Sequence, residues 1–363
     1  MDGCEHYDTI PGIYLKWTNA AFASPTASGR NGRGISLNQG GAYVAKTLNH
    51  QVSWVVNWAM NILISGGGGT GPSGIYVGAN VGTGLVGITV ETDWTLSIYA
   101  GGNLAMNSSP FSIHPNSWYY YEFKYELGVG GSSGNNITVV GTLKVNGNIV
   151  VTCAGVDTGI NLNTLLIQTA TVDYHNFICP NIVGTSTIDD IIIADCSGNG
   201  LHNDFMGDIA IGVIFPNGDS SITWTPTPSG SSYSLVNSQF VEDSAGTISS
   251  NTPSQVDVFN WQPLPSTVGT IIALHYGIFA KKNGEGTRAI QPTVGGSSIP
   301  TLPFNESVAP YSAPFSGYPP PIYYPGDTYV YYFFAMDSQP GGTPVAWTVA
   351  VVNGTTFGVE LYS

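Results

Sequence analysis

The spacing of Glu91, Asp93 and Leu96 comes closer to a hydrolytic site than any other part of this chain. Retaining glycoside hydrolysis needs two carboxyl groups, and E-x-D-x-x-E on a strand would direct alternating carboxylates into one cleft. Glu91 and Asp93 fit this spacing, but Leu96 occupies the position of the second Glu. Because the acid/base is missing, the sequence predicts that the protein is not an enzyme.

Other catalytic signatures are also incomplete. Residues 130–134 match G-x-S-x-G, but a nucleophile elbow needs a strand before it and a helix after it, and this run is a flexible loop. The glycines at 66–69 have no neighbouring Lys, which a phosphate-binding loop requires. The six histidines show no H-x-x-x-H spacing, so structural roles are expected for them.

One segment imitates the opening of a calcium loop. Residues 195–200 read D-x-S-x-N-G, which alternates the oxygen ligands that Ca²⁺ prefers, but Met206 stands where the bidentate Glu should be. The candidate ligands are Asp195, Ser197, Asn199 and Asp204. The alternative is that these carboxylates accept hydrogen bonds within a turn, without a metal.

Trp94 and Tyr99 are candidates for sugar binding, since exposed aromatic rings can stack on saccharides. Packing in the hydrophobic core is the alternative role for both rings. Four cysteines, Cys4, Cys153, Cys179 and Cys196, form no C-x-x-C doublet. We expect them to be buried free thiols, and their spacing assigns no disulfide pairing.

The elements that must position these residues are strands. Only 9% of the 363 residues are charged, whereas 42% are hydrophobic and 12% aromatic, and no long stretch has apolar residues at helical spacing. The length suits about two domains. With 23 acidic and nine basic residues, the net charge of -14 argues against a nucleic-acid partner. No stretch is apolar enough to predict a membrane span, and the N-terminus shows no signal peptide, which predicts synthesis in the cytoplasm.

Period-2 alternation predicts strands at 52–58 and 118–127, each with one apolar face and one solvated face. Asn146-Gly147 within 142–151 predicts a tight hairpin of type I′. Further strands are predicted at 191–193, 209–215, 221–224, 271–281, 328–336, 345–352 and 357–361.

Residues 300–325 are rich in proline, which predicts an extended segment. Its tyrosines are Tyr311, Tyr318, Tyr323 and Tyr324. They are candidates for an interaction arm that contacts another protein or a second copy of the chain, because Tyr combines a large apolar area with a polar group. The alternative is a long ordered loop whose tyrosines pack on their own domain.

The most distinctive string runs over residues 187–226, TIDDIIIADCSGNGLHNDFMGDIAIGVIFPNGDSSITWTP. Together with GRNG at 29–32, WYYYEFK at 118–124, VNG at 145–147 and DGCEHY at 2–7, it resembles a family of tailed-bacteriophage virion structural proteins. The resemblance is good over residues 1–265 and weak beyond them.

This resemblance implies an all-β chain with a concanavalin A-like (laminin-G-like) jelly roll at 1–197 and a second β-sandwich domain at 198–363. It also implies a non-enzymatic component on the surface of a virion, as a tail fibre or adhesin or as a head decoration. Other virion proteins would be its partners, and a homo-oligomer, most simply a trimer, would be its assembled form. A lectin-like module that binds host-surface glycan is the alternative function. A glycoside hydrolase is the third hypothesis, and Leu96 argues against it.

Overall fold

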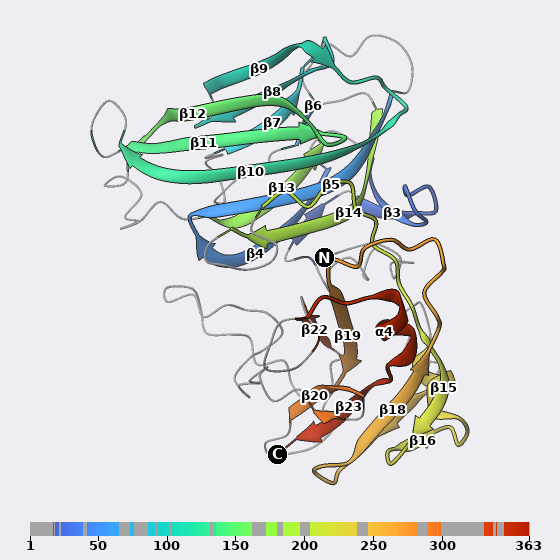
Figure 1. The fold of residues 1–363 in the computed structure, drawn as a ribbon. Helices are drawn as coiled ribbons and strands as arrows, with labels where there is room; N and C mark the ends of the chain where they lie inside the picture. Colours follow the sequence, from blue (N-terminus) through green and yellow to red (C-terminus); the bar gives the residue numbers. More distant parts are fainter. Residues whose placement is uncertain are drawn as a thin grey trace. The chain divides into compact units, whose positions relative to one another are not determined.

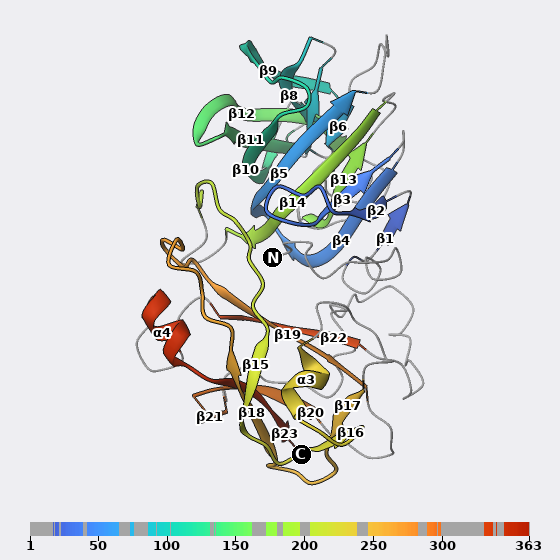
Figure 2. The same cartoon turned by 90° about the vertical axis from the view of Figure 1, so that its right-hand side faces the viewer.

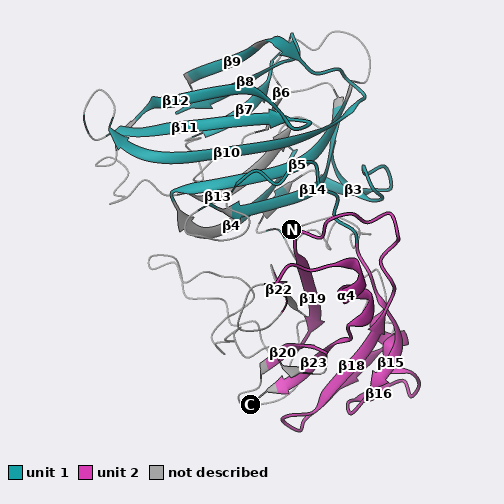
Figure 3. Cartoon of the chain, in the orientation of Figure 1, with its two compact units in different colours: residues 1–212 teal, residues 213–363 magenta. Residues whose placement is uncertain are grey.

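A computed structural model of the chain describes residues 17, 19–21, 23–38, 42–64, 73–75, 86–91, 93–101, 103–130, 134, 136–161, 172–179, 184–196, 204–237, 246–281, 289–295, 297–298, 330–336, 339 and 345–362. The chain divides into two compact units, residues 1–212 and 213–363 (Figure 3). The boundary expected from the sequence lies earlier, between 197 and 198. The difference arises because residues 204–211 bind to the first unit, as described below.

The prediction of an all-β chain is confirmed, since antiparallel sheets form both units and the two helices among the described residues have only five and six residues. Unit 1 contains three antiparallel sheets, with strand orders β12-β11-β10-β5-β14-β3-β2, β1-β4-β13 and β6-β7-β8-β9. Their bounds are β1 Asn19–Ala21, β2 Ala23–Thr26, β3 Gly34–Leu37, β4 Ala42–Gln51, β5 Ser53–Ile64, β6 Ser73–Ile75, β7 Val86–Val90, β8 Thr95–Ala100, β9 Asn103–Ser112, β10 Trp118–Gly130, β11 Asn136–Val145, β12 Asn148–Asn161, β13 Val172–Cys179 and β14 Gly184–Asp195.

The seven-stranded sheet is one layer of unit 1, and the two smaller sheets lie against it (Figures 1 and 2). Side chains from all three sheets form one core cluster. Trp58 of β5 stacks on Tyr121 of β10 with ring centroids 5.2 Å apart, and Phe123 stacks on Tyr125 along β10. These positions follow the predicted alternation, because every second side chain of a strand points to the same side.

The outer face of the seven-stranded sheet differs from expectation. The sequence predicts a solvated face for β10, but Tyr120 and Glu122 are only 1% exposed there. Asn57, which lies opposite Glu122 on β5, is fully buried as well. The prediction of a solvated face is wrong for this part of β10, because residues 204–211 cover it.

The predicted hairpin at 142–151 is confirmed, since β11 and β12 pair around Asn146 and Gly147. Both turn residues have positive φ, 49° and 80°, as a type I′ turn requires.

Unit 2 contains a five-stranded sheet of order β15-β18-β23-β20-β21 and two separate strand pairs, β16-β17 and β19-β22. Its elements are β15 Pro216–Ser221, β16 Thr225–Thr227, α3 Ser232–Val236, β17 Thr247–Ser249, β18 Val256–Trp261, β19 Leu274–Ala280, β20 Ala289–Val294, β21 Ser297–Ser298, β22 Val330–Met336, α4 Val349–Gly354 and β23 Phe357–Tyr362. Trp347 and Phe357 anchor an aromatic cluster in its core, and the Trp347 indole N–H donates to the carbonyl of Met336.

Three strand predictions in the second half are wrong. Residues 209–215 are not a strand, because side chains of unit 1 bind the backbone groups of Ile209 and Ile211. Of the expected strand at 221–224, Ser221 ends β15 and residues 222–224 lie between β15 and β16. The expected strand at 345–352 contains the start of α4, whose first turn is capped by the Thr348 hydroxyl. Among the described residues, no helix is long and apolar enough to cross a membrane.

Candidate functional site

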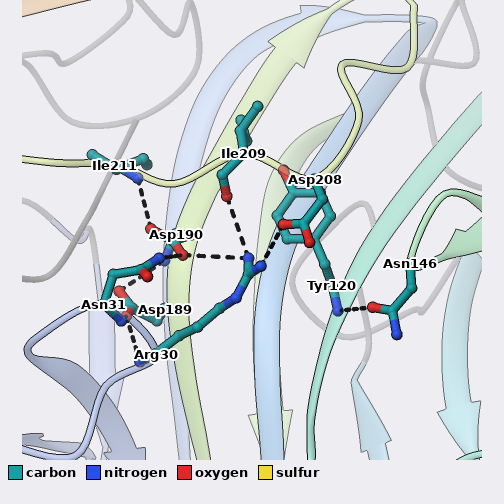
Figure 4. Close-up of polar contacts among 9 residues, drawn as sticks. All are labelled: Arg30, Asn31, Tyr120, Asn146, Asp189, Asp190, Asp208, Ile209 and Ile211. Atoms are coloured by element: carbon teal, nitrogen blue, oxygen red, sulfur yellow. Dashed lines mark hydrogen bonds and ion pairs between the residues drawn. The ribbon is translucent and has the colours of Figure 1, made fainter. Parts of the chain in front are cut away.

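Polar side chains from distant parts of the sequence meet on the outer face of the seven-stranded sheet (Figure 4). They come from the β2–β3 turn, from β10, from the β11–β12 hairpin, from β14 and from residues 204–211. Four of the strings that carry the virion resemblance contribute residues to this network. They are GRNG at 29–32, WYYYEFK at 118–124, VNG at 145–147 and the string at 187–226, which contains Asp189 and Asp190. We call this network the 204–211 anchor.

Asp189 and Asp190 form the centre of the anchor. The pairing between β14 and β5 shifts register between Asp189 and Ile192, and Asp190 has a φ of 50°, so the two adjacent carboxylates serve different segments. Asp189 accepts the backbone N–H groups of Arg30 and Asn31 at 2.8 and 3.3 Å. Asp190 accepts the backbone N–H of Ile211 at 2.7 Å and the Asn31 amide at 2.7 Å.

Arg30 is the cation of this network. Its guanidinium lies 3.6 Å from Asp190, pairs with Asp208 at 2.5 Å and donates to the carbonyl of Ile209 at 3.4 Å. It also stacks over the ring of Tyr120, 5.3 Å from the centroid. One guanidinium therefore faces two carboxylates, those of Asp190 and Asp208.

Glu122 holds the other end of the segment. Its Oε1 accepts the backbone N–H groups of Met206 and Gly207, each at 2.8 Å, while its buried Oε2 has no partner in the described structure. Lys124 of the same strand pairs with Asp204 at 3.0 Å. Lys144 of β11 lies 3.9 Å from the centroid of the Phe205 ring. Segment 204–211 is thus fixed by charge-assisted bonds along its length.

Burial shifts the protonation of the two central carboxyls. Burial, with the negative charge of Asp190 as the second cause, raises the pKa of Asp189 to about 7, although three backbone N–H groups favour its ionised form. Burial also raises the pKa of Asp190, against the opposing effects of the Ile211 N–H and Arg30. Both residues are fully buried, and their oxygens already accept hydrogen bonds. The anchor therefore has the features of a structural device rather than a catalytic site.

A second polar group lies on the sheet formed by β6–β9, around the turn between β7 and β8. The turn is closed by two backbone hydrogen bonds, from the Glu91 N–H to the carbonyl of Thr95 and from the Trp94 N–H to the carbonyl of Glu91. Trp94 adopts a φ of 67° within it. The phenol of Tyr99 donates to Glu91 at 3.0 Å. Asp93 is exposed and accepts both the N–H and the hydroxyl of Thr95, which lowers the pKa of its carboxyl.

Next to this turn, the sheet carries a row of hydroxyl and amide groups. Asn107 donates to the hydroxyls of Thr95 and Ser97, each at 3.0 Å. Thr89 lies opposite Ser97 in the β7–β8 register, and its buried hydroxyl has no partner in the described structure. The alternate residues Ile88, Leu96 and Ile98 belong to the core, so the polar row lies on the other side of the sheet. There Thr89, Thr95 and Ser97 are buried, whereas Tyr99 and Asn107 are partly exposed. We call these residues, from Thr89 to Asn107, the β7–β9 polar face.

The structure separates the residues predicted for sugar binding. Tyr99 is a half-buried member of the polar face, whereas Trp94 packs against the core of unit 1. Leu96, at the third position of the hydrolase spacing, is fully buried in that core. Glu91 and Asp93 lie in a turn and not on one strand.

Of the predicted calcium ligands, Asp204 pairs with Lys124 and accepts the N–H of Phe205. Asp195 ends β14, and Ser197 and Asn199 lie outside the described residues. No group of three or more His, Cys, Asp or Glu side chains that could hold a metal occurs in the described part of the chain. Cys153 is a buried free thiol and Cys196 is half-buried. Cys4 lies outside the described residues, as do the arm tyrosines Tyr311, Tyr318, Tyr323 and Tyr324.

The sequence did not predict this network. Arg30 and Asp189 stand in strings that carry the resemblance, Glu122 belongs to a face that was expected to be solvated, and Asp204 was a candidate calcium ligand. A usable signal was the carboxylate pair Asp189-Asp190 inside a strand of apolar residues, since buried carboxylates need dedicated partners.

No protein-family model and no curated protein matches the chain. Among solved structures, it is similar to the alginate lyase Aly36B, with 12% identity and a TM-score of 0.38 over 53% of this chain and 92% of that one. It is also similar to the cellulose-induced protein Cip1, with 16% identity and a TM-score of 0.33 over 47% and 84%. A third similarity is to the carbohydrate-binding module CBM66 from Bacillus subtilis, with 9% identity and a TM-score of 0.31 over 49% and 95%.

Proposed function

We propose that unit 1 is a non-catalytic carbohydrate-binding domain whose ligand meets the β7–β9 polar face. The observation that carries this proposal is the grouping of Glu91, Tyr99 and Asn107 on one face that the core does not use. Carboxylate, phenol and amide groups on a rigid sheet offer the convergent hydrogen bonds that sugar hydroxyls require. The half-buried Tyr99 ring supplies an apolar surface beside them.

The geometry also favours binding without catalysis. Glycoside hydrolysis needs two carboxyl groups that face the same bond across a cleft. Here Glu91 and Asp93 belong to one tight turn, and Leu96 points into the core. Asp93 accepts two hydrogen bonds that keep its carboxyl ionised, which suits an acceptor and not a general acid.

Binding of the full chain to an array of immobilised neutral and acidic saccharides tests the proposal. We expect binding that is lost in a Glu91→Ala variant and weakened in Tyr99→Phe. Glu126→Ala, which removes an exposed carboxylate from β10, is the matched control and should bind as the unaltered chain does. Absence of binding to every saccharide, or equal binding by Glu91→Ala, would reject the proposal.

A second candidate function is that of a structural component on the surface of a tailed-phage virion. The observation that favours it is that strings quoted for the virion resemblance converge in the 204–211 anchor. Such convergence is expected if the resemblance reflects a common fold, although fold alone does not assign function. Labelling purified particles with an antibody against the chain tests it: label on heads or tails supports the role, and unlabelled particles reject it. The two functions are compatible in an adhesin.

A further inference from the structure

The charges around Asp189 and Asp190 do not balance. Both carboxylates are fully buried, and Asp208 lies within reach of the same cation. The Arg30 guanidinium pairs with Asp190 and Asp208, whereas the described contacts of Asp189 are backbone N–H groups. The other titratable groups of the anchor are Glu122, Lys124 and the phenol of Tyr120 on β10, Lys144 on β11, and Asp204. Lys124 pairs with Asp204 and Lys144 lies over the Phe205 ring, so both cations serve the 204–207 end.

Asp189 and Asp190 are adjacent and buried, and in the described structure the Arg30 guanidinium pairs with Asp190 and not with Asp189, so the two carboxylates repel each other when both are ionised. A proton on Asp189 removes this repulsion. Burial and the neighbouring Asp190 raise the pKa of Asp189 to about 7, so this proton is exchanged near neutral pH.

The two carboxylates differ in what they hold. Asp189 accepts N–H groups of the β2–β3 turn and of its own strand. Asp190 accepts the N–H of Ile211, at the end of a segment that has no strand pairing. Repulsion within the pair is therefore relieved most easily by movement of Asp190 away from Asp189, at the expense of the bond to Ile211.

We propose that the Asp189–Asp190 pair is a pH-responsive anchor, which fixes residues 209–211 to the seven-stranded sheet while Asp189 is protonated and loosens them when both carboxyls are ionised. Glu122 and Lys124 hold the 204–207 end of the segment through separate contacts. Loosening thus begins at Ile211, beside the boundary between the two units. The proposal is independent of carbohydrate binding.

Amide hydrogen exchange of the full chain between pH 5.5 and 8.5 tests this proposal, after correction for the intrinsic pH dependence of exchange. We expect the protection of the Ile211 amide to fall by about tenfold or more as the pH rises through 7. Amides of the β10–β11 ladder should keep their protection, and so should that of Ser232, which the exposed Asp219 holds. Ile211 protection that is constant or rises with pH would overturn the proposal.

Two variants distinguish an effect of the Asp189–Asp190 pair from a general change in the stability of unit 1. Asp189→Asn removes the titrating partner, so Ile211 protection should no longer change with pH. Asp208→Asn alters an exposed carboxylate and leaves the Arg30 guanidinium free to pair with Asp190, which should reduce the loss of protection at high pH. A loss in Asp208→Asn as large as in the unaltered chain would contradict the charge argument, even if Asp189→Asn does not fold.

Discussion

At the scale of single residues, the molecule depends on carboxylates that accept backbone N–H groups. Asp189, Asp190 and Glu122 do so in unit 1, and Asp257 accepts the N–H groups of Thr223 and Trp224 in unit 2. A buried carboxylate is costly unless such donors satisfy it. In a chain with few charged residues, these positions fix segments that no sheet or helix holds.

The raised pKa of Asp189 predicts how stability depends on pH. Because this carboxyl binds its proton more tightly in the folded state, it contributes stability that is fully present below the unfolded pKa of 3.8 and is lost as pH rises to about 7. The difference corresponds to at most about 4 kcal/mol. We expect denaturant unfolding to show that unit 1 is less stable at pH 8 than at pH 5. In Asp189→Asn, the slope of the unfolding free energy against pH should be smaller. A slope unchanged in the variant would assign the pH dependence to other groups.

Glu122 provides a second prediction at this scale. Its Oε2 and the amide of the opposite Asn57 are buried without partners in the described structure. Glu122→Gln keeps the acceptor for Met206 and Gly207 and adds an N–H that can donate to Asn57, so stability should be unchanged or higher. Glu122→Ala leaves the two N–H groups unsatisfied and should cost about 1–3 kcal/mol for each. Thermal unfolding compares the two, and a Gln variant as unstable as Ala would contradict this account.

At the scale of elements, the sequence predicts strands well where one face is apolar. The positions of β5, β10 and the β11–β12 hairpin follow from alternation and from Asn146-Gly147. The prediction fails at 209–215, where Ile209 and Ile211 alternate as in a strand but side-chain acceptors take the place of a neighbouring strand. Alternation indicates which side chains are apolar, but it does not indicate which groups the backbone N–H and C=O of these residues bind.

The turn between β8 and β9 approaches the backbone of β12 closely, and this contact could not be predicted from the sequence pattern. Gly101 has a φ of 58°, and a Cβ there would lie 1.8 Å from the carbonyl oxygen of Thr158 on β12. We expect Gly101→Ala to destabilise unit 1 by several kcal/mol, because the backbone must move apart. Gly159→Ala is the matched control, since Gly159 has a φ of 71° with open space around it, and it should cost only about 1–2 kcal/mol. Equal midpoints of denaturant unfolding for both variants would contradict the close approach.

At the scale of the whole molecule, the chain consists of two units, and the first includes residues 204–211. The virion resemblance predicted an all-β chain with two β domains, and the all-β class is confirmed. The boundary between 197 and 198 came from the resemblance. The sequence showed no reason why Glu122, 84 residues before Met206, and Asp190 should bind this segment.

This organisation predicts the behaviour of two fragments. Residues 1–212 keep the anchored segment, whereas residues 1–197 lose it and expose Glu122 and Asp190 without their N–H donors. We expect the shorter fragment to unfold at a clearly lower temperature. Equal thermal stability of the two fragments would show that the segment does not contribute to the fold of unit 1.

The central claim is that the β7–β9 polar face binds carbohydrate. The most direct test is to titrate neutral oligosaccharides into the ¹⁵N-labelled full chain and to follow its amide NMR signals. We predict saturable shifts for amides at residues 89–99 and 103–108, and none for those at 204–211. Saturable shifts confined to another part of the chain, or no shifts with any saccharide, would contradict the claim.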